Sequence, residues 1–100
     1  MVDIEEQPDG ILVKFNISRL DIMKSSELLR QLSTALERAP EKMSVDVSEL
    51  DFIDSAVLGV FVRIHDLSIK QKKKVYFINL SKYVKNMFDS TRIGRVLNIQ

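Results

Sequence analysis

The sequence of 100 residues contains no cysteine. This absence excludes disulfide bonds, a thiolate nucleophile and any metal site built on cysteine ligands. Tryptophan is also absent, and His65 is the only histidine. The three glycines form neither of the glycine-rich patterns that hold phosphate groups in nucleotide-binding proteins. We therefore expect no metal ion and no cofactor.

Neither sign of charge dominates, because 15 lysine and arginine residues face 14 aspartate and glutamate residues, for a net charge of +1. A domain that binds nucleic acid by electrostatic attraction carries a basic surplus. The lysine-rich segment 70–74 has no interleaved aromatic residue, which is typical of a solvated connection. We therefore expect no direct contact with nucleic acid.

Long apolar runs are missing as well. None approaches the roughly 20 residues needed to cross a bilayer. The first ten residues are acidic and lack the basic and apolar regions of a signal peptide. These absences predict a cytoplasmic protein without membrane insertion.

The spacing of the polar side chains also argues against an enzyme. A Ser-His-Asp hydrolase would have to combine Ser55, His65 and Asp54. Residues ten positions apart along one helix are about 15 Å apart, which is beyond hydrogen-bond reach. We therefore expect no catalytic residues and no enzymatic activity.

The apolar and charged shares of 45% and 29% are ordinary for a globular protein, and the length suits a single domain over residues 1–100. Alternating apolar residues predict strands in segments 11–17 and 43–47, and a nearly continuous run of β-branched and aromatic residues predicts a central strand in 75–80. Segment 2–6 is expected to form a short edge strand that pairs with 11–17 as a hairpin. Helical spacing predicts a first helix that ends before Pro40, and two more over 56–69 and 82–90. Segment 96–99 fits either a strand or a helical turn. The order β-β-α-β-α-β-α predicts an α/β fold, a small mixed sheet with helices mainly on one face.

The pattern of segment 45–67 predicts a strand, a tight loop and a helix. Asp54 and Ser55 both favour the residue that caps a helix start. The first turn of a helix has unpaired backbone N–H groups and a positive dipole end, so it tolerates negative charge near Ser55. Capping alone explains such a pair in most proteins. Asp21, which precedes the first helix, is equally interpretable as a turn or capping residue.

The segment Phe52-Ile53-Asp54-Ser55-Ala56-Val57-Leu58-Gly59 resembles the F-[MI]-D-S-[SA]-G-L-G signature of the STAS domain family, which includes the bacterial anti-sigma factor antagonists, or anti-anti-sigma factors. Seven of the eight positions fit, and Val57 replaces a glycine. Leu20-Asp21 and the segment 84–89 match the family in register. The resemblance covers residues 11–99.

The resemblance implies regulation of transcription by partner switching. In this scheme the unphosphorylated chain binds an anti-sigma factor that is itself a serine kinase, and so releases a sigma factor. Phosphorylation of Ser55 abolishes binding, and a phosphatase restores it. The residues implied at the partner-binding surface are Asp21, Asp54, Ser55, Ala56, Val57, Leu58 and Gly59.

An adaptor without a phosphorylation cycle is the alternative, for example a scaffold subunit of a transport ATPase or of a signalling complex. Val57 favours this interpretation, because a branched side chain in place of glycine could hinder a kinase. Together with Leu58 it would form an apolar knob beside Ser55, suited to docking.

Overall fold

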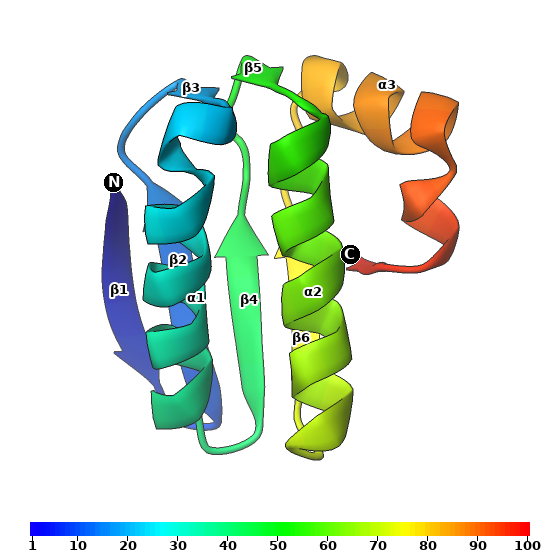
Figure 1. The fold of residues 1–100 in the computed structure, drawn as a ribbon. Helices are drawn as coiled ribbons and strands as arrows, with labels where there is room; N and C mark the ends of the chain where they lie inside the picture. The colour runs from blue at the N-terminus through cyan, green and yellow to red at the C-terminus, as the bar shows by residue number, and fades with distance from the viewer.

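The computed structural model describes residues 1–100 and contains a five-stranded sheet in the order β1-β2-β4-β6-β7, together with a two-stranded sheet formed by β3 and β5 (Figure 1). The strands are β1 (Val2–Gln7), β2 (Gly10–Phe15), β3 (Arg19–Leu20), β4 (Lys42–Asp46), β5 (Phe52–Ile53), β6 (Lys74–Ile78) and β7 (Asn98–Ile99). The helices are α1 (Ser25–Arg38), α2 (Ser55–Lys70) and α3 (Lys82–Thr91), with single 3₁₀ turns η1 (Ile22–Lys24) and η2 (Ile93–Arg95). The predicted order of elements is confirmed, and the C-terminal segment contains both a helical turn and a short strand.

The sheet is mixed, as expected. β1 and β2 form an antiparallel hairpin, whereas β2, β4, β6 and β7 run parallel. Gly10 opens β2 where it lies against β4, and a Cβ atom at this position would be 2.4 Å from the carbonyl oxygen of Lys42. Only glycine fits this close approach of two backbones.

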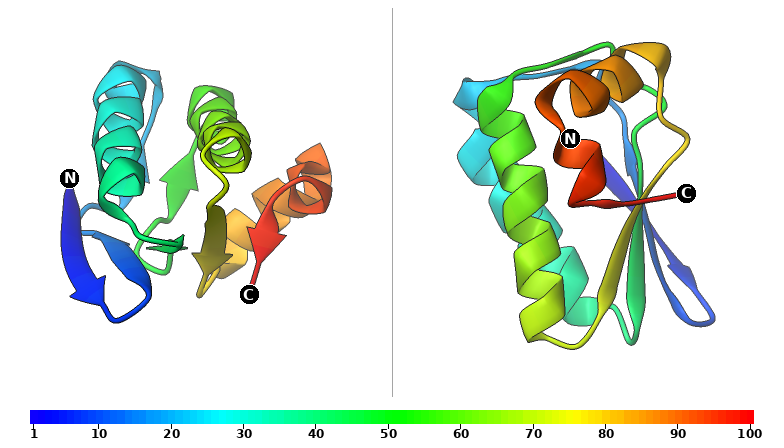
Figure 2. Two further views of the ribbon diagram at one scale, coloured as in Figure 1. Left: turned by 90° about the horizontal axis from the view of Figure 1, so that it is seen from below. Right: turned by 90° about the vertical axis from the view of Figure 1, so that its right-hand side faces the viewer.

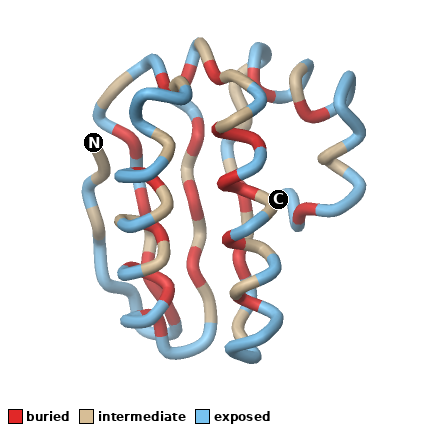
Figure 3. The backbone as a smooth tube through the Cα atoms, viewed as in Figure 1, coloured by how far each residue is buried: buried red, intermediate tan, exposed pale blue.

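The helices cover one face of the sheet (Figure 2). In β2 the side chains of Ile11, Val13 and Phe15 are buried beneath them, while Leu12 and Lys14 lie on the opposite face. Figure 3 shows such an alternation of buried and half-buried residues along β4. The same alternation continues in β4 and β6. Strands with one buried face require a cover on that side alone, so the predicted one-sided arrangement is confirmed.

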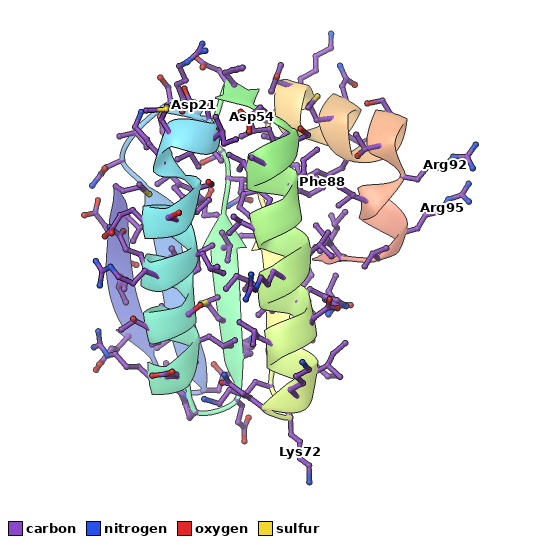
Figure 4. All side chains as sticks on the ribbon, in the orientation of Figure 1. Asp21, Asp54, Lys72, Phe88, Arg92 and Arg95 are labelled. Atoms are coloured by element: carbon purple, nitrogen blue, oxygen red, sulfur yellow. The ribbon has the colours of Figure 1, made fainter.

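Three phenylalanines connect the sheet to two helices. Phe61 of α2 and Phe77 of β6 have ring centroids 4.9 Å apart. Phe88 of α3 meets both rings edge to face, at 6.3 and 6.0 Å, and is labelled in Figure 4. Such aromatic pairs contribute about 0.5–1.5 kcal/mol each beyond their buried area. They fix α3 beside the start of α2.

The lysine-rich segment between α2 and β6 is only partly a solvated connection. Lys72 and Lys74 are exposed, as expected. The ammonium group of Lys73 instead donates hydrogen bonds to the carbonyl oxygens of Leu36, at 2.8 Å, and Glu37, at 3.1 Å. These carbonyls belong to the last turn of α1, where the N–H donors of a following helical turn are missing. The carbonyl oxygen of Leu36 also accepts a hydrogen bond from the N–H of Ala39, at 3.2 Å, so Lys73 adds a second donor there.

Candidate functional site

The candidate site lies where the chain enters η1 and α2 at the same edge of the molecule. The short strands β3 and β5 pair in parallel, with Arg19 opposite Phe52 and Leu20 opposite Ile53. Because η1 follows β3 and α2 follows β5, this pairing places the two helix starts side by side (Figure 1). A strand of two residues is too short to show an alternation of apolar and polar side chains, so this pairing cannot be predicted from the sequence pattern.

Asp54 accepts a hydrogen bond from each of the two helix starts with one carboxylate group, and it is the N-cap of α2. Its Oδ1 accepts a hydrogen bond from the backbone N–H of Val57 in α2, at 3.1 Å. Its Oδ2 accepts a second from the backbone N–H of Ile22 in η1, at 2.9 Å. Asp54 therefore links two segments that are far apart in sequence.

Asp21 lies at the same end of the molecule and caps η1 (Figure 4). Its Oδ1 accepts a hydrogen bond from the backbone N–H of Met23, at 3.0 Å, and its Oδ2 lies 3.6 Å from Nε of Arg19. The guanidinium group of Arg19 also stacks on the ring of Phe52, 3.9 Å from its centroid. The capping interpretation of Asp21 is thus confirmed.

Ser55 is the first residue of α2, and it is exposed. Its placement at a helix start is confirmed, although the helix begins one residue earlier than predicted and Asp54 alone is the cap. The Ser55 hydroxyl forms no hydrogen bond within the chain, and neither do the backbone N–H groups of Ser55 and Ala56. These free donors at the positive end of the helix dipole favour a negative charge beside Ser55.

Val57 and Leu58 are buried, with exposed fractions of 0% and 2%. The prediction of an apolar docking knob is therefore wrong. Val57 lies four residues before Phe61, so both side chains point from α2 into the core, where Phe61 is also buried. Valine at this position fills the core and leaves access to Ser55 open.

Gly59 is exposed on α2, four residues after Ser55 and therefore on the same face of the helix, one turn along. A Cβ atom at Gly59 would meet no other atom within 4 Å. Packing within the chain does not require glycine here. The structure thus brings together Asp21, Asp54 and Ser55. Ala56 is half-buried beside them, and Gly59 borders the site one turn further along α2.

The prediction missed two exposed apolar residues of the site. Ile22 and Met23 in η1 have exposed fractions of 66% and 88%. The backbone of Ile22 is bonded to Asp54, so the pair lies directly beside the start of α2. A sequence signal was present, because two adjacent apolar residues flanked by Asp21 and Lys24 fit neither strand alternation nor helical spacing.

A separate polar cleft of about 820 Å³ lies at the carboxyl ends of β2 and β4. Its charged lining residues are Asp3, Lys14, Arg19, Lys24, Asp46 and Glu49. Burial raises the pKa of Asp46, but hydrogen bonds from Ser48 and Asn79 and the charge of Lys14 outweigh burial and lower the pKa overall. Positive and negative groups balance in this cleft, so it favours no particular ligand charge.

The family model of the STAS domain matches residues 2–100. No curated protein matches the chain in sequence. No helix of the structure has the length and apolar character required to cross a membrane.

Several solved structures share the fold. An anti-sigma factor antagonist domain protein of Planctomyces limnophilus is 18% identical, with a TM-score of 0.84 over 98% of this chain and 87% of that one. An anti-sigma factor antagonist of Mycobacterium paratuberculosis is 12% identical, with a TM-score of 0.85 over 99% and 83%. The Bacillus antagonist SpoIIAA is 16% identical in both its unphosphorylated and its phosphorylated form, with TM-scores of 0.79 and 0.72. The unphosphorylated form aligns over 100% of this chain and 88% of SpoIIAA, and the phosphorylated form over 100% and 91%.

Proposed function

The chain belongs to the STAS domain family, and from this premise we propose that it is an anti-sigma factor antagonist that binds an anti-sigma factor and is switched off by phosphorylation of Ser55. Its fold is that of the solved antagonists. The observation that carries the proposal is an exposed, unbonded serine hydroxyl at the first position of a helix whose start is held by Asp54. The proposed partners are an anti-sigma factor with serine kinase activity and a phosphatase, and the proposed compartment is the cytoplasm.

The environment of Ser55 suits a phosphorylation site. A kinase needs an accessible hydroxyl, and Ser55 would lose no internal hydrogen bond on entering a kinase active site. A phosphate group adds about −1.5 to −2 charges. The unpaired N–H groups of Ser55 and Ala56, at the positive end of the α2 dipole, would stabilise this charge locally. The fold therefore tolerates both states of Ser55.

The same phosphate would change the surface that a partner meets. Asp54 is adjacent to Ser55, and Asp21 lies at the neighbouring helix start. A phosphate group on Ser55, next to these two carboxylates, would concentrate negative charge on this surface. The partner's surface, which fits the neutral hydroxyl, would then be less complementary to it. A difference in affinity between the two forms is sufficient for a switch, and no unfolding is required. In this proposal the chain supplies a binding surface and no catalytic group.

The alternative, an adaptor without phosphorylation, depended on Val57 as an obstacle or a docking contact. The buried side chain of Val57 serves neither purpose. We therefore retain the antagonist as the proposed function.

The proposal is tested by mixing the purified chain with each anti-sigma factor kinase of its source organism in the presence of Mg²⁺ and ATP. We expect one kinase to add a single phosphoryl group, which intact-mass and peptide mass spectrometry locate at Ser55, with Ser55→Ala as the negative control. Calorimetry without ATP should give equal affinities for the wild type and Ser55→Ala, and at least tenfold weaker binding for Ser55→Asp. Equal affinities for all three forms would exclude a charge switch at Ser55.

A further inference from the structure

We propose that Tyr83 of α3 is a positioning residue for the phosphorylation of Ser55. In this inference the side chain of Tyr83 holds the segment that leads into α2, so that the Ser55 hydroxyl has a fixed orientation when a kinase binds. The inference rests on the proposed function and goes beyond it, because it assigns a role in the phosphorylation step to a residue of another helix, outside the segment around Ser55 that carries the family resemblance.

The position of Ser55 depends on the segment before it. The hydroxyl and the backbone N–H group of Ser55 form no hydrogen bond within the chain. The only regular structure in segment 50–54 is β5, which has two residues. Phosphoryl transfer requires the attacking oxygen to lie in line with the leaving group, and a displacement of about 1 Å can lower the rate about 100-fold. The contacts that hold segment 50–54 therefore determine how Ser55 is presented to a kinase.

Two contacts of Tyr83 hold β5. Its hydroxyl donates a hydrogen bond to the carbonyl oxygen of Ile53, at 3.0 Å. This carbonyl shares a peptide group with the nitrogen of Asp54, the N-cap of α2. The ring of Tyr83 meets the ring of Phe52 edge to face, with centroids 6.2 Å apart. Figure 1 shows the start of α3 beside β5 and the start of α2. Tyr83 therefore fixes the peptide group directly before the helix that begins with Ser55.

The same segment is held on its other side by the residues before η1. The carbonyl oxygen of Ser18 accepts hydrogen bonds from the N–H groups of Asp51 and Phe52, at 2.8 and 3.2 Å. Neighbouring residues of a strand direct their backbone groups to opposite sides, so the carbonyl group of Ile53 points away from β3 and toward α3. Segment 50–54 is thus held between β3 and α3, and Tyr83 supplies the hydrogen bond on the α3 side.

Loss of the Tyr83 hydroxyl would disturb the peptide group between Ile53 and Asp54. Ile53 is 1% exposed, so its carbonyl oxygen has little access to water. A buried acceptor that loses its donor is unfavourable, and the peptide group turns toward water where the backbone allows it. Such a turn changes the direction in which the chain enters α2, and with it the orientation of the Ser55 hydroxyl. The ring contact with Phe52 remains in Tyr83→Phe, so α3 stays in place.

The test measures Ser55 phosphorylation by the kinase that the proposed function requires, at saturating Mg²⁺ and ATP, with the wild type, Tyr83→Phe and Tyr76→Phe. Tyr76 is the matched control, since it is the only other tyrosine and its side chain lies on the face of the sheet that the helices leave uncovered. We expect Tyr83→Phe to lower kcat about threefold to tenfold while KM for the chain stays within about twofold, because orientation affects the chemical step more than binding. Tyr76→Phe should change neither constant.

Two further measurements separate positioning from a general loss of stability. Ser81→Ala removes the cap of α3 and the hydrogen bond from the Ser81 hydroxyl to the carbonyl oxygen of Leu50. It should therefore lower the urea midpoint of unfolding more than Tyr83→Phe does, and lower kcat less. In ¹H–¹⁵N NMR spectra, Tyr83→Phe should shift the amide signals of Asp54 and Ser55 and leave those of α1 in place.

The outcomes distinguish the positioning role from the proposed function. Equal kcat values for the wild type and Tyr83→Phe, or a loss of kcat in Ser81→Ala as large as that in Tyr83→Phe, would overturn the positioning role while the function stands. A rise in KM alone would mean that Tyr83 contacts the kinase directly, which also overturns the inference. If no kinase phosphorylates the wild type at Ser55, the proposed function fails and the positioning role fails with it.

Discussion

Asp54 accepts a hydrogen bond from the backbone of Ile22, a residue 32 positions earlier in the chain, through the carboxylate that also caps α2. The geometry around Ser55 thus depends on a contact between two helix starts and not on α2 alone. A carboxylate that accepts two backbone N–H groups satisfies donors that neither helix can pair internally. The first prediction tests this contact.

Replacing Asp54 with alanine should lower the free energy of unfolding by about 1–3 kcal/mol, because one substitution removes the N-cap of α2 and the acceptor of the Ile22 N–H in η1. Urea unfolding followed by circular dichroism measures the loss. Asp54→Asn is the matched variant: its carbonyl oxygen can still accept from Val57, while its amide group cannot accept from Ile22. Asp54→Asn should therefore lose less stability than Asp54→Ala. Equal losses would contradict separate contributions from the hydrogen bonds to α2 and to η1.

Ser55→Ala should change the free energy of unfolding by less than about 0.5 kcal/mol. The hydroxyl has no hydrogen-bond partner in the chain, and alanine is the most favourable residue in a helix. The cap cost of about 0.5–2 kcal/mol that a serine N-cap would carry does not apply, since Asp54 is the cap. Thermal unfolding monitored by calorimetry gives the difference, and a large loss would mean that Ser55 supports the fold.

Val57→Gly should destabilise the protein by about 2 kcal/mol or more, because it removes a fully buried side chain and adds a glycine to α2. The free energy of unfolding of Val57→Ala should lie between those of the wild type and Val57→Gly. This comparison separates the loss of the buried side chain from the low helix propensity of glycine. Under conditions where each variant remains folded, the phosphorylation rate of Ser55 should be unchanged. A faster rate in Val57→Gly would restore the interpretation of valine as an obstacle to the kinase.

The contribution of Asp46 to the free energy of unfolding should depend on pH. Its pKa is lowered in the folded protein, so the folded state favours the carboxylate more than the unfolded chain does. The resulting stabilisation is complete above the unfolded pKa, near 3.9, and is lost as the pH falls through the lower folded pKa. Urea midpoints of the wild type and Asp46→Asn should therefore differ most near neutral pH and converge in acid. A difference between the two urea midpoints that stays the same from neutral pH into acid would contradict a lowered pKa of Asp46.

The sequence predicted those parts of the fold that depend on local patterns. Apolar spacing predicts α1 and α2, and the alternation in β2 predicts a sheet that is covered on one face. Each of these features is encoded within about one helical turn or a few strand residues. The position of Ser55 at a helix start followed from the same local information.

The missed features all depend on contacts between distant segments. Pairing of β3 with β5 involves residues more than 30 positions apart, and it alone brings Ile22 to Asp54. The error at Val57 has a different origin. The helical spacing of Val57, Phe61 and Ile64 in the sequence indicates an inward-facing side chain, whereas the docking interpretation depends only on the departure of Val57 from the family signature. Burial was the physical constraint on this position.

Because Lys73 is hydrogen-bonded to the last turn of α1, the chemical reactivity of its amine should depend on local opening of this part of the structure. Acylation requires the Nζ lone pair of a lysine to reach the reagent, and Nζ of Lys73 is held against two carbonyl oxygens of α1. Labelling of Lys73 should therefore be slow while these hydrogen bonds persist and faster when they open. Lys72 is the preceding residue in the chain, and its side chain extends into solvent without such a partner (Figure 4). The ratio of label at these neighbouring lysines therefore measures how often the end of α1 detaches from the connection between α2 and β6 while the rest of the protein stays folded.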